Sequence, residues 1–368
     1  MPEGDTIRRL ADKITRRFAG ERCSRCVTRD PRLVGLDLAG RTLVGADAVG
    51  KHLLIRFDDG RTLHAHLRMD GSFDVGPASR EPEWQRRIEL WMETGRLTGI
   101  NVPILEVVAT AHEDSVIGHL GPDLCALEPP DLVEALDRLT ADPVRPLGGA
   151  LLDQRNVAGF GNVYVVEIPF LFAVSPNQPV GTVTGLDTLL ALGAALIRTN
   201  AQRGPQNTTG RKLANSDHWI YGRRRRPCPL CATPLDGWEE GESPWGRVAT
   251  WCPSCQQLRP ERRADAIRAR RLTALHPARR DPHFPVDVRA LAQRGSASVM
   301  DSGVAPRPGA TDDETTEVAS NAERMPADAG AVRESAQRVD DLEQRRTAEA
   351  REAGEPSGTT ATGPAQRR

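Results

Sequence analysis

Apolar residues near the start of the chain recur at helical spacing. These residues are Ile7, Leu10, Ala11, Ile14 and Phe18. Their separations of one helical turn predict an amphipathic helix, with Asp5 as its N-cap.

Between residues 40 and 110 the pattern changes to short apolar runs. HLLIRF and TLHAHLRM are examples, bounded by DDG, DG and GR sequences. Short runs punctuated by turn residues predict antiparallel strands. From 130 to 200 the segments DLVEALDRL, GGALLDQRNVAG, NVYVVEIPFLF and LDTLLALGAALI indicate helices. We therefore expect a β region followed by a helical region.

The end of the chain has a composition that does not favour a folded core. Residues 301–368 contain no aromatic residue and only five of Leu, Ile, Val and Phe combined. Such a segment buries too little apolar area to offset its ordering entropy, so we expect disorder. Residues 259–300 are rich in arginine and are expected to form a weakly ordered basic linker. The folded part should therefore be residues 1–258.

Composition and charge exclude some classes of protein. None of the 368 residues lies in an apolar run long enough to span a bilayer, so no membrane protein is expected. The charged start MPEGDTIRRL does not fit a secretory signal, so we expect no export. The net charge of −1 hides a block at 201–300 with 18 basic and 9 acidic residues. Such a block is typical of proteins that bind polyphosphates, although a solvated charged surface remains the alternative.

Two Cys-x-x-Cys pairs indicate a metal site. Cys228 and Cys231 form the first pair, Cys252 and Cys255 form the second, and 20 residues separate the two pairs. This spacing is typical of one closed, structural zinc ion with four thiolate ligands. The metal would supply folding energy that the short, Trp- and Arg-rich segment 219–258 lacks. Redox pairs or incidental thiols are the alternative.

The remaining cysteines are expected to pack rather than to bind metal. Cys23 and Cys26 form a third pair, but no fourth pair completes a site for them. We expect Cys125 to be buried packing.

The Met1-Pro2 start has a chemical consequence. Removal of the initiator methionine would leave a secondary α-amine, which is partly neutral near pH 7. A neutral amine attacks carbonyl or aminal carbons, and a secondary amine yields an iminium that withdraws electrons. Glu3 lies beside it and can move protons. A Met-Pro start alone is weak evidence for catalysis.

Several motifs occur together with this start. Lys51, one of only three lysines, lies in VGKHLLIRF at a turn-to-strand boundary. In LLDQRNVAGFGNVY, glycines break one helix and Asn162 can cap the next. In GRVATWCPSCQ, Arg247 precedes Cys252 by five positions. With MPEGDT, HLRMDGS and HLGPDL, these motifs resemble the formamidopyrimidine-DNA glycosylase/endonuclease VIII family, on its actinobacterial endonuclease VIII-like branch, over about residues 1–258.

The resemblance implies a multidomain α+β fold. It implies an N-terminal catalytic domain at 1–125, which is a two-layer antiparallel β-sandwich with flanking helices. A helix–two-turn–helix DNA-binding domain at 126–218 and a zinc-finger β-hairpin at 219–258 would follow, before the linker and tail at 259–368. We expect a monomer that works on damaged DNA in the bacterial cytoplasm, at the nucleoid, with one structural Zn²⁺ and no membrane partner. The sequence assigns no partner to the tail.

The resemblance also implies roles for individual residues. Pro2 would be the nucleophile at C1′ of the damaged nucleotide, and Glu3 the acid/base. Lys51 and Arg247 would donate protons during elimination and contact phosphates. Asn162 would contact phosphates as well, and Met69 would fill the gap left by the everted base.

Each of these residues also has a simpler interpretation. Lys51 can be a solvated surface lysine and Asn162 only a helix cap. Arg247 can be one more arginine in a basic block, and Met69 can be core packing. His64 and His66 alternate on a predicted strand without a third ligand at a suitable spacing. We therefore interpret them as structural or DNA-lining.

The implied activity is a bifunctional DNA glycosylase/AP lyase of base-excision repair that acts on oxidised pyrimidines and nicks the strand by β,δ-elimination. One alternative is an oxidised-purine (formamidopyrimidine) glycosylase. The segment INVPILEVVATAHED lacks the Arg-Arg-Phe-Gly type loop of that branch, which argues against 8-oxoguanine specificity. A second alternative is a non-catalytic zinc-ribbon DNA-binding protein. A third is a structural zinc protein of an RNA assembly, which leaves Pro2, Glu3 and Lys51 unexplained.

Overall fold

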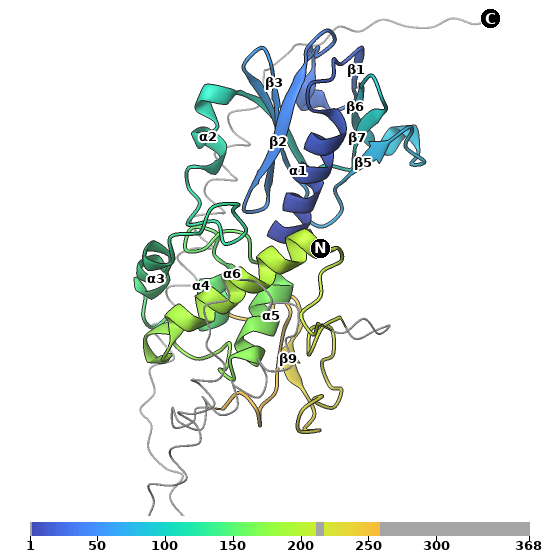
Figure 1. The fold of residues 1–368 in the computed structure, drawn as a ribbon. Helices are drawn as coiled ribbons and strands as arrows, with labels where there is room; N and C mark the ends of the chain where they lie inside the picture. Colours follow the sequence, from blue (N-terminus) through green and yellow to red (C-terminus); the bar gives the residue numbers. More distant parts are fainter. Residues whose placement is uncertain (1, 211–216, 258–368) are drawn as a thin grey trace, which may run out of the picture. The chain divides into compact units, whose positions relative to one another are not determined.

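The computed structural model describes residues 2–210 and 217–257 (Figure 1). The expectations for the linker and the tail therefore lie outside the described residues. The α-helices in the described part are α1 (Gly4–Phe18), α2 (Asp114–Ile117), α3 (Leu132–Thr140), α4 (Leu147–Leu152), α5 (Asn162–Leu171) and α6 (Leu186–Arg203). Short 3-10 helices lie at Pro31–Leu33, Glu83–Gln85, Thr110–His112 and Val180–Thr182.

Most strands belong to two four-stranded antiparallel sheets. The first has the order β1 (Arg25–Thr28), β6 (Arg86–Trp91), β7 (Arg96–Ile100) and β5 (Ser72–Gly76). The second has the order β2 (Leu43–Val49), β3 (His52–Phe57), β4 (Arg61–His66) and β8 (Ile104–Ala109). A separate hairpin pairs β9 (Asp236–Trp238) with β10 (Ala249–Trp251).

The two sheets share one hydrophobic core, to which α1 contributes. Leu53 and Leu63 of the second sheet lie in the same buried cluster as Leu90 of the first. The predicted amphipathic helix is confirmed, because Ile7, Ala11, Ile14 and Phe18 are all fully buried. The expectation that Asp5 caps this helix is wrong. Glu3 occupies the N-cap position, and Asp5 lies buried in the first turn, where it accepts a hydrogen bond from Arg9.

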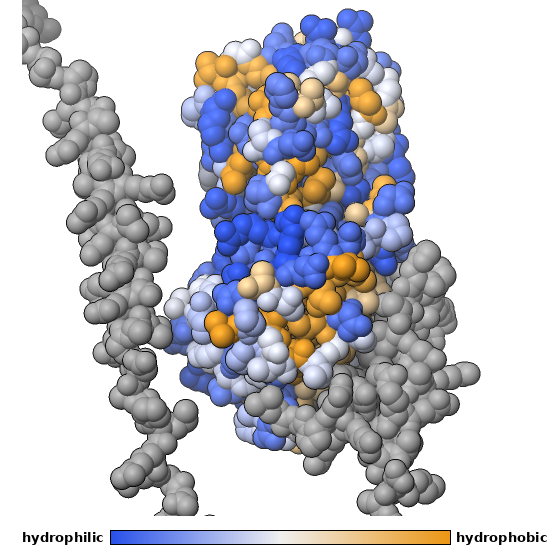
Figure 2. Space-filling model, turned by 90° about the vertical axis from the view of Figure 1, so that its left-hand side faces the viewer, coloured by the Kyte–Doolittle hydropathy of each residue, from blue (hydrophilic) through white to orange (hydrophobic). Residues whose placement is uncertain are grey.

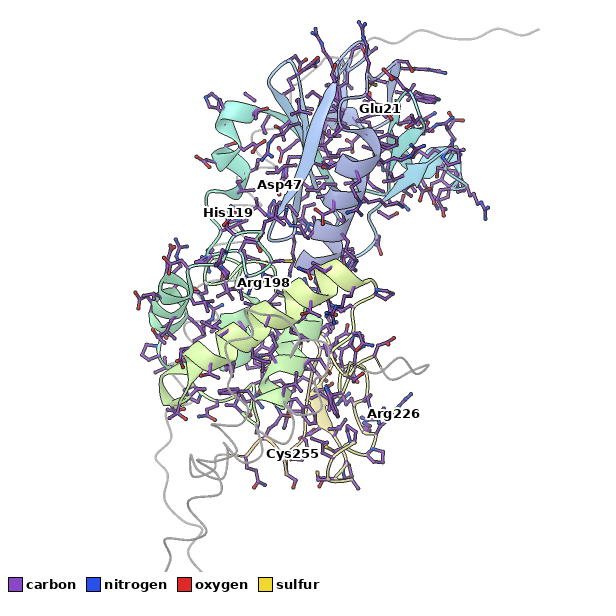
Figure 3. The ribbon with its side chains drawn as sticks, in the orientation of Figure 1. Glu21, Asp47, His119, Arg198, Arg226 and Cys255 are labelled. Atoms are coloured by element: carbon purple, nitrogen blue, oxygen red, sulfur yellow. The ribbon has the colours of Figure 1, made fainter. Side chains whose placement is uncertain are left out.

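A second buried cluster joins the helices to the finger hairpin. It contains Phe160, Leu190 and Ile197 from the helical segment and Trp219 and Cys252 from the finger. The finger segment therefore completes a core that it could not form alone, which agrees with its small size. Cys255, labelled in Figure 3, lies in this cluster. The α+β class with antiparallel sheets, predicted from the sequence, is confirmed.

The surface has no band of apolar residues on the face drawn in Figure 2. Hydrophobic residues there form separate patches between hydrophilic ones. Among the described helices, none combines the length and the apolar character needed to cross a membrane.

Candidate active site and metal centre

The Glu3 side chain is held at the start of helix α5. Its Oε2 accepts a hydrogen bond of 3.0 Å from the main-chain N–H of Gly161, and its Oε1 accepts one of 2.9 Å from that of Val163. The side chain is fully buried. Burial raises the pKa of Glu3, while nearby Lys51 and the two N–H donors oppose the rise. A carboxyl with a raised pKa keeps its proton closer to neutral pH, which suits a general acid.

Glycines allow the Glu3 side chain to lie close to the start of helix α5. A Cβ on Gly161 would lie 2.4 Å from Cδ of Glu3, so any larger residue would displace the carboxylate. Gly4 donates a main-chain hydrogen bond of 2.9 Å to Gly159, whose φ of +103° also favours glycine. The N-terminal segment is thus fixed against the connection between α4 and α5.

Asn162 does not cap helix α5, and that expectation is wrong. Gly161 occupies the N-cap position, and the Glu3 carboxylate supplies the acceptor that a capping side chain would give. Asn162 is the first residue of the helix and is buried, and its Oδ1 has no hydrogen-bond partner. Its side chain hydrogen-bonds the Tyr221 hydroxyl, which opposes the rise in the pKa of Tyr221 caused by burial and by Glu3.

Lys51 lies close enough to Glu3 to interact with it. It follows Gly50 in the turn between β2 and β3, and a Cβ on Gly50 would lie 3.1 Å from Cβ of Ala158. Burial lowers the pKa of Lys51, Arg247 lowers it further, and Glu3 opposes both effects. The structure therefore places both Glu3 and Arg247 within electrostatic reach of Lys51. The interpretation of Lys51 as a solvated surface lysine is wrong.

Met69 and Arg247 are both accessible. The Met69 residue is 54% exposed, which excludes core packing, and it follows Arg68, whose φ is +47°. Arg247 is exposed at the end of the turn before β10, and its guanidinium lies 3.3 Å from Glu240. Neither side chain is required by the hydrophobic core, so both are free to meet a ligand.

Histidines form a hydrogen-bonded chain on the second sheet. Nδ1 of His52 lies 2.8 Å from Nε2 of His64, and Nδ1 of His64 lies 2.9 Å from Oε1 of Glu106. The rings of His66 and His119 stand edge-on to His52 at centroid distances of 5.0 and 5.8 Å, and Figure 3 labels His119. Burial is the largest cause that lowers the pKa of His52 to about 3 and that of His66 to about 4. Alternation along the strand pointed to the two β4 histidines, but nothing in the sequence pointed to His52 and His119, because their approach depends on strand register and on the fold.

Glu167 is a second structural carboxylate that the sequence analysis missed. It is fully buried in α5 and accepts hydrogen bonds from the Thr208 hydroxyl and from the main-chain N–H groups of Trp219, Ile220 and Tyr221. The available signal was an acidic residue inside the apolar segment NVYVVEIPFLF. Glu167 fixes the chain on both sides of residues 211–216.

Four cysteines form a candidate metal centre. The Sγ atoms of Cys228, Cys231, Cys252 and Cys255 all lie within 4.8 Å of one another. Cys228 and Cys255 are 3.9 Å apart, and Cys231 and Cys252 are 3.4 Å apart. In the described residues this is the cluster suited to a metal ion. Cys125 is buried, as expected, and Cys23 is buried outside this cluster.

Comparisons with known proteins relate the chain to one group. Residues 1–100 match the family model described as formamidopyrimidine-DNA glycosylase N-terminal domain. The "Probable endonuclease 8 2" of Streptomyces coelicolor is 43% identical over 262 residues, covering 70% of this chain and 94% of that protein. The "DNA-(apurinic or apyrimidinic site) lyase Nei2" of Mycolicibacterium smegmatis is 38% identical over 258 residues, covering 70% of this chain and 99% of that protein.

Weaker similarity links the chain to a relative named formamidopyrimidine-DNA glycosylase and to a solved structure with the same fold. The "Formamidopyrimidine-DNA glycosylase" of Moorella thermoacetica is 31% identical over 261 residues, covering 64% of this chain and 93% of that protein. The crystal structure of the Lactococcus lactis formamidopyrimidine-DNA glycosylase, bound non-covalently to DNA with an AP site, has a TM-score of 0.60 and 20% identity. It covers 70% of this chain and 100% of that chain, and at this identity it shows the fold.

Proposed function

The chain belongs to the formamidopyrimidine-DNA glycosylase/endonuclease VIII family, and from that premise we propose how its residues carry out the reaction. It is a bifunctional DNA glycosylase and abasic-site lyase of base-excision repair. Relatives named endonuclease 8 or Nei2 share 36–43% identity with it, against 31% for the formamidopyrimidine-DNA glycosylase above. Oxidised pyrimidines and abasic sites are the substrates we propose.

Pro2 is the proposed nucleophile once Met1 has been removed. Its secondary amine adds to C1′ of an everted nucleotide, the glycosidic bond breaks, and the base leaves with a proton. The amine then loses its proton, and the C1′–O4′ bond breaks as O4′ takes up a proton, which opens the sugar and leaves an iminium between Pro2 and C1′. This iminium acidifies the C2′ proton. Loss of that proton expels the 3′ phosphate, and a second elimination expels the 5′ phosphate.

The single observation that carries this proposal is the clamped Glu3 carboxyl next to Pro2. Two main-chain N–H groups fix its position, and burial raises its pKa, so it is both oriented and able to hold a proton. Such a group can deliver a proton to the opening sugar or to the departing base. Lys51, with its lowered pKa, is the proposed proton donor of the elimination steps.

We propose that three side chains bind the phosphates that flank the lesion. Lys51 and Arg247 supply positive charge, and arginine can bind phosphate through two N–H groups. The Asn162 amide has two N–H bonds, so a phosphate can share it with Tyr221. Exposed Met69 is suited to fill the space left by the everted base. We propose that this chemistry takes place on chromosomal DNA in the bacterial cytoplasm.

The cysteine cluster fits one structural Zn²⁺. A tetrahedral site with Zn–S bonds of about 2.3 Å requires sulfur–sulfur distances of about 3.8 Å. The observed separations of 3.9 and 3.4 Å agree with this requirement. Cys228, Cys231, Cys252 and Cys255 would hold the ion, whose contribution is to the stability of the finger that carries Arg247.

Borohydride trapping tests the proposal. The full chain is mixed with duplexes that carry an oxidised pyrimidine, an oxidised purine or an abasic site, and is then reduced. We expect a covalent adduct with the pyrimidine lesion and the abasic site, and peptide mapping should locate it at Pro2. Pro2→Gly should shift or abolish the adduct. Binding to lesions without an adduct would favour the non-catalytic zinc-ribbon DNA-binding protein. Trapping mainly on the purine lesion would favour the oxidised-purine glycosylase.

A further inference from the structure

The ring of Trp245 packs against two glycines of helix α4. A Cβ on Gly148 would lie 2.6 Å from Cζ2 of Trp245, and one on Gly149 would lie 3.3 Å from its Cβ. Only the absence of side chains at these positions lets the indole come so close to the helix. Arg145, Pro146 and Asp153 line the groove beside this contact.

The hairpin supports the same indole from another direction. Trp238 of β9 stands edge-on to Trp245 with centroids 5.5 Å apart, and its ring lies 4.8 Å from that of Trp251 in β10. Aromatic pairs at these distances add packing energy beyond the area that they bury. The position of Trp245 is therefore fixed both by α4 and by the hairpin strands.

A closed turn connects Trp245 to Arg247. The Ser243 hydroxyl donates a hydrogen bond of 2.6 Å to the Arg247 carbonyl and accepts one of 2.9 Å from the Arg247 N–H. Gly246, with φ of +72°, donates a main-chain hydrogen bond of 2.9 Å to Ser243. Residues 243–247 therefore form one rigid unit, and its anchored residue is Trp245.

The Arg247 side chain is held only weakly by its own contacts. Its side chain is 44% exposed, and its ion pair is with Glu240, whose side chain is 71% exposed. Exposed ion pairs contribute little to the ordering of a side chain. The location of this arginine near Lys51 therefore depends on the backbone of the turn rather than on its own contacts.

We propose that Trp245 is a positioning residue that holds the Arg247 turn for contact with a DNA phosphate, through its packing on Gly148 and Gly149 of α4. This inference rests on the phosphate role proposed above for Arg247. It also assigns a purpose to the ten-residue connection between β9 and β10, which is longer than a tight hairpin needs.

The test uses variants that disturb the contact from each side. Trp245→Leu removes the ring, and Gly148→Ala inserts a methyl group where the ring lies. Alanine is the better helix former, so Gly148→Ala should not weaken α4 itself. Trp84→Leu is the matched control, because Trp84 is 71% exposed outside the finger. Zinc content is measured for each protein.

Binding to a duplex with a tetrahydrofuran abasic analogue is measured over a range of salt concentrations. Each phosphate contact adds about 0.9 to the slope of log affinity against log salt. We expect Trp245→Leu and Gly148→Ala to lower affinity about tenfold and to reduce that slope by about one contact, as Arg247→Ala should. Added to Arg247→Ala, Trp245→Leu should cost less than about twofold more, since positioning has no further effect once the arginine is gone.

Two results would overturn the inference alone. One is an unchanged salt slope in Trp245→Leu with zinc retained. The other is a full tenfold loss in the Arg247→Ala background, which would show that the ring acts only through general stability. An unchanged slope in Arg247→Ala itself would overturn the phosphate role of Arg247 and this inference with it, whereas failure of the wild-type protein to cleave abasic DNA would overturn the proposed function.

Discussion

Oε1 of Glu3 accepts a hydrogen bond of 2.9 Å from the main-chain N–H of Val163, 160 positions further along the chain. The carboxylate thus does two things at once. It satisfies N–H groups at the start of α5 that otherwise lack an acceptor, and those groups fix its orientation beside Pro2. Helix capping and the placement of the proposed acid/base are therefore one interaction.

Gly161→Ala should disable the site without unfolding the chain. The new methyl group would lie 2.4 Å from Cδ of Glu3, so the carboxylate must leave its two N–H donors. Displacement of a catalytic group by about 1 Å can cost about 100-fold in rate, and we expect a loss of that order in single-turnover base excision. Gly76→Ala is the control, because a Cβ there meets nothing within 4 Å. Equal activity of the two variants would show that the clamp does not matter.

Glu167→Gln should destabilise the helical part of the protein. Glu167 accepts three main-chain N–H bonds and one hydroxyl bond, and a glutamine would turn an N–H₂ group toward some of these donors. Unsatisfied buried donors cost about 1–3 kcal/mol each, so the free energy of unfolding should fall by more than about 3 kcal/mol. Urea denaturation measures it, with Glu134→Gln at an exposed position of α3 as the control. A fall smaller than about 1 kcal/mol would contradict this assignment.

Stability should decrease as the pH falls below neutrality. The pKa of His52 is lowered to about 3 and that of His66 to about 4, so the unfolded chain takes up protons first, near the ordinary value of 6.5. Their contribution is complete above pH 6.5 and decreases progressively as the pH falls below 6.5, and the loss is complete below about 4 for His66 and about 3 for His52. Each of these two half-buried histidines adds a slope of at most about 1.4 kcal/mol per pH unit.

Thermal and urea unfolding between pH 7 and pH 4.5 would measure this effect. His52→Gln should flatten the dependence, because glutamine does not titrate, so the burial and the neighbouring histidines and Lys51 that lower the pKa of His52 no longer oppose a protonation. His112→Gln, at an exposed position, should leave the slope unchanged. Identical slopes in the two variants would refute the link to His52.

The sequence predicted those features that depend on local pattern. Helix α1 follows from the spacing of Ile7, Ala11, Ile14 and Phe18, and the cysteine cluster follows from two Cys-x-x-Cys pairs. The helix predicted over GGALLDQRNVAG is shorter in the structure, where α4 ends at Leu152 and glycine-containing turns follow. The β and helical regions were both predicted in the correct order.

Contacts between segments far apart in the sequence could not be predicted from local pattern. The spacing of Asn162 before a helical segment suggested a cap, but the acceptor comes from Glu3, at the other end of the folded part. The His52–His64–Glu106 chain likewise requires the registers of β3, β4 and β8. A linear pattern contains no register, so neither relationship can be read from composition or periodicity.

Removal of the metal should weaken DNA binding far more than it affects the two sheets. Cys231 is exposed, so a chelator can reach the site, while Cys228 and Cys252 are buried in the cluster that also contains the helices. Loss of the ion should loosen the finger, including Arg247, and also the segment just after α5, where Gln256 donates a hydrogen bond of 2.8 Å to the Val174 carbonyl.

We expect affinity for abasic-analogue DNA to fall more than about tenfold and to return when zinc is added back. Hydrogen exchange should increase across 219–257 and α5 but not in α1 or the sheets, whose hydrophobic cluster contains none of the four cysteines. Chelator already saturated with zinc is the control. Unchanged affinity after confirmed metal loss would count against the metal-supported finger as a DNA-binding element.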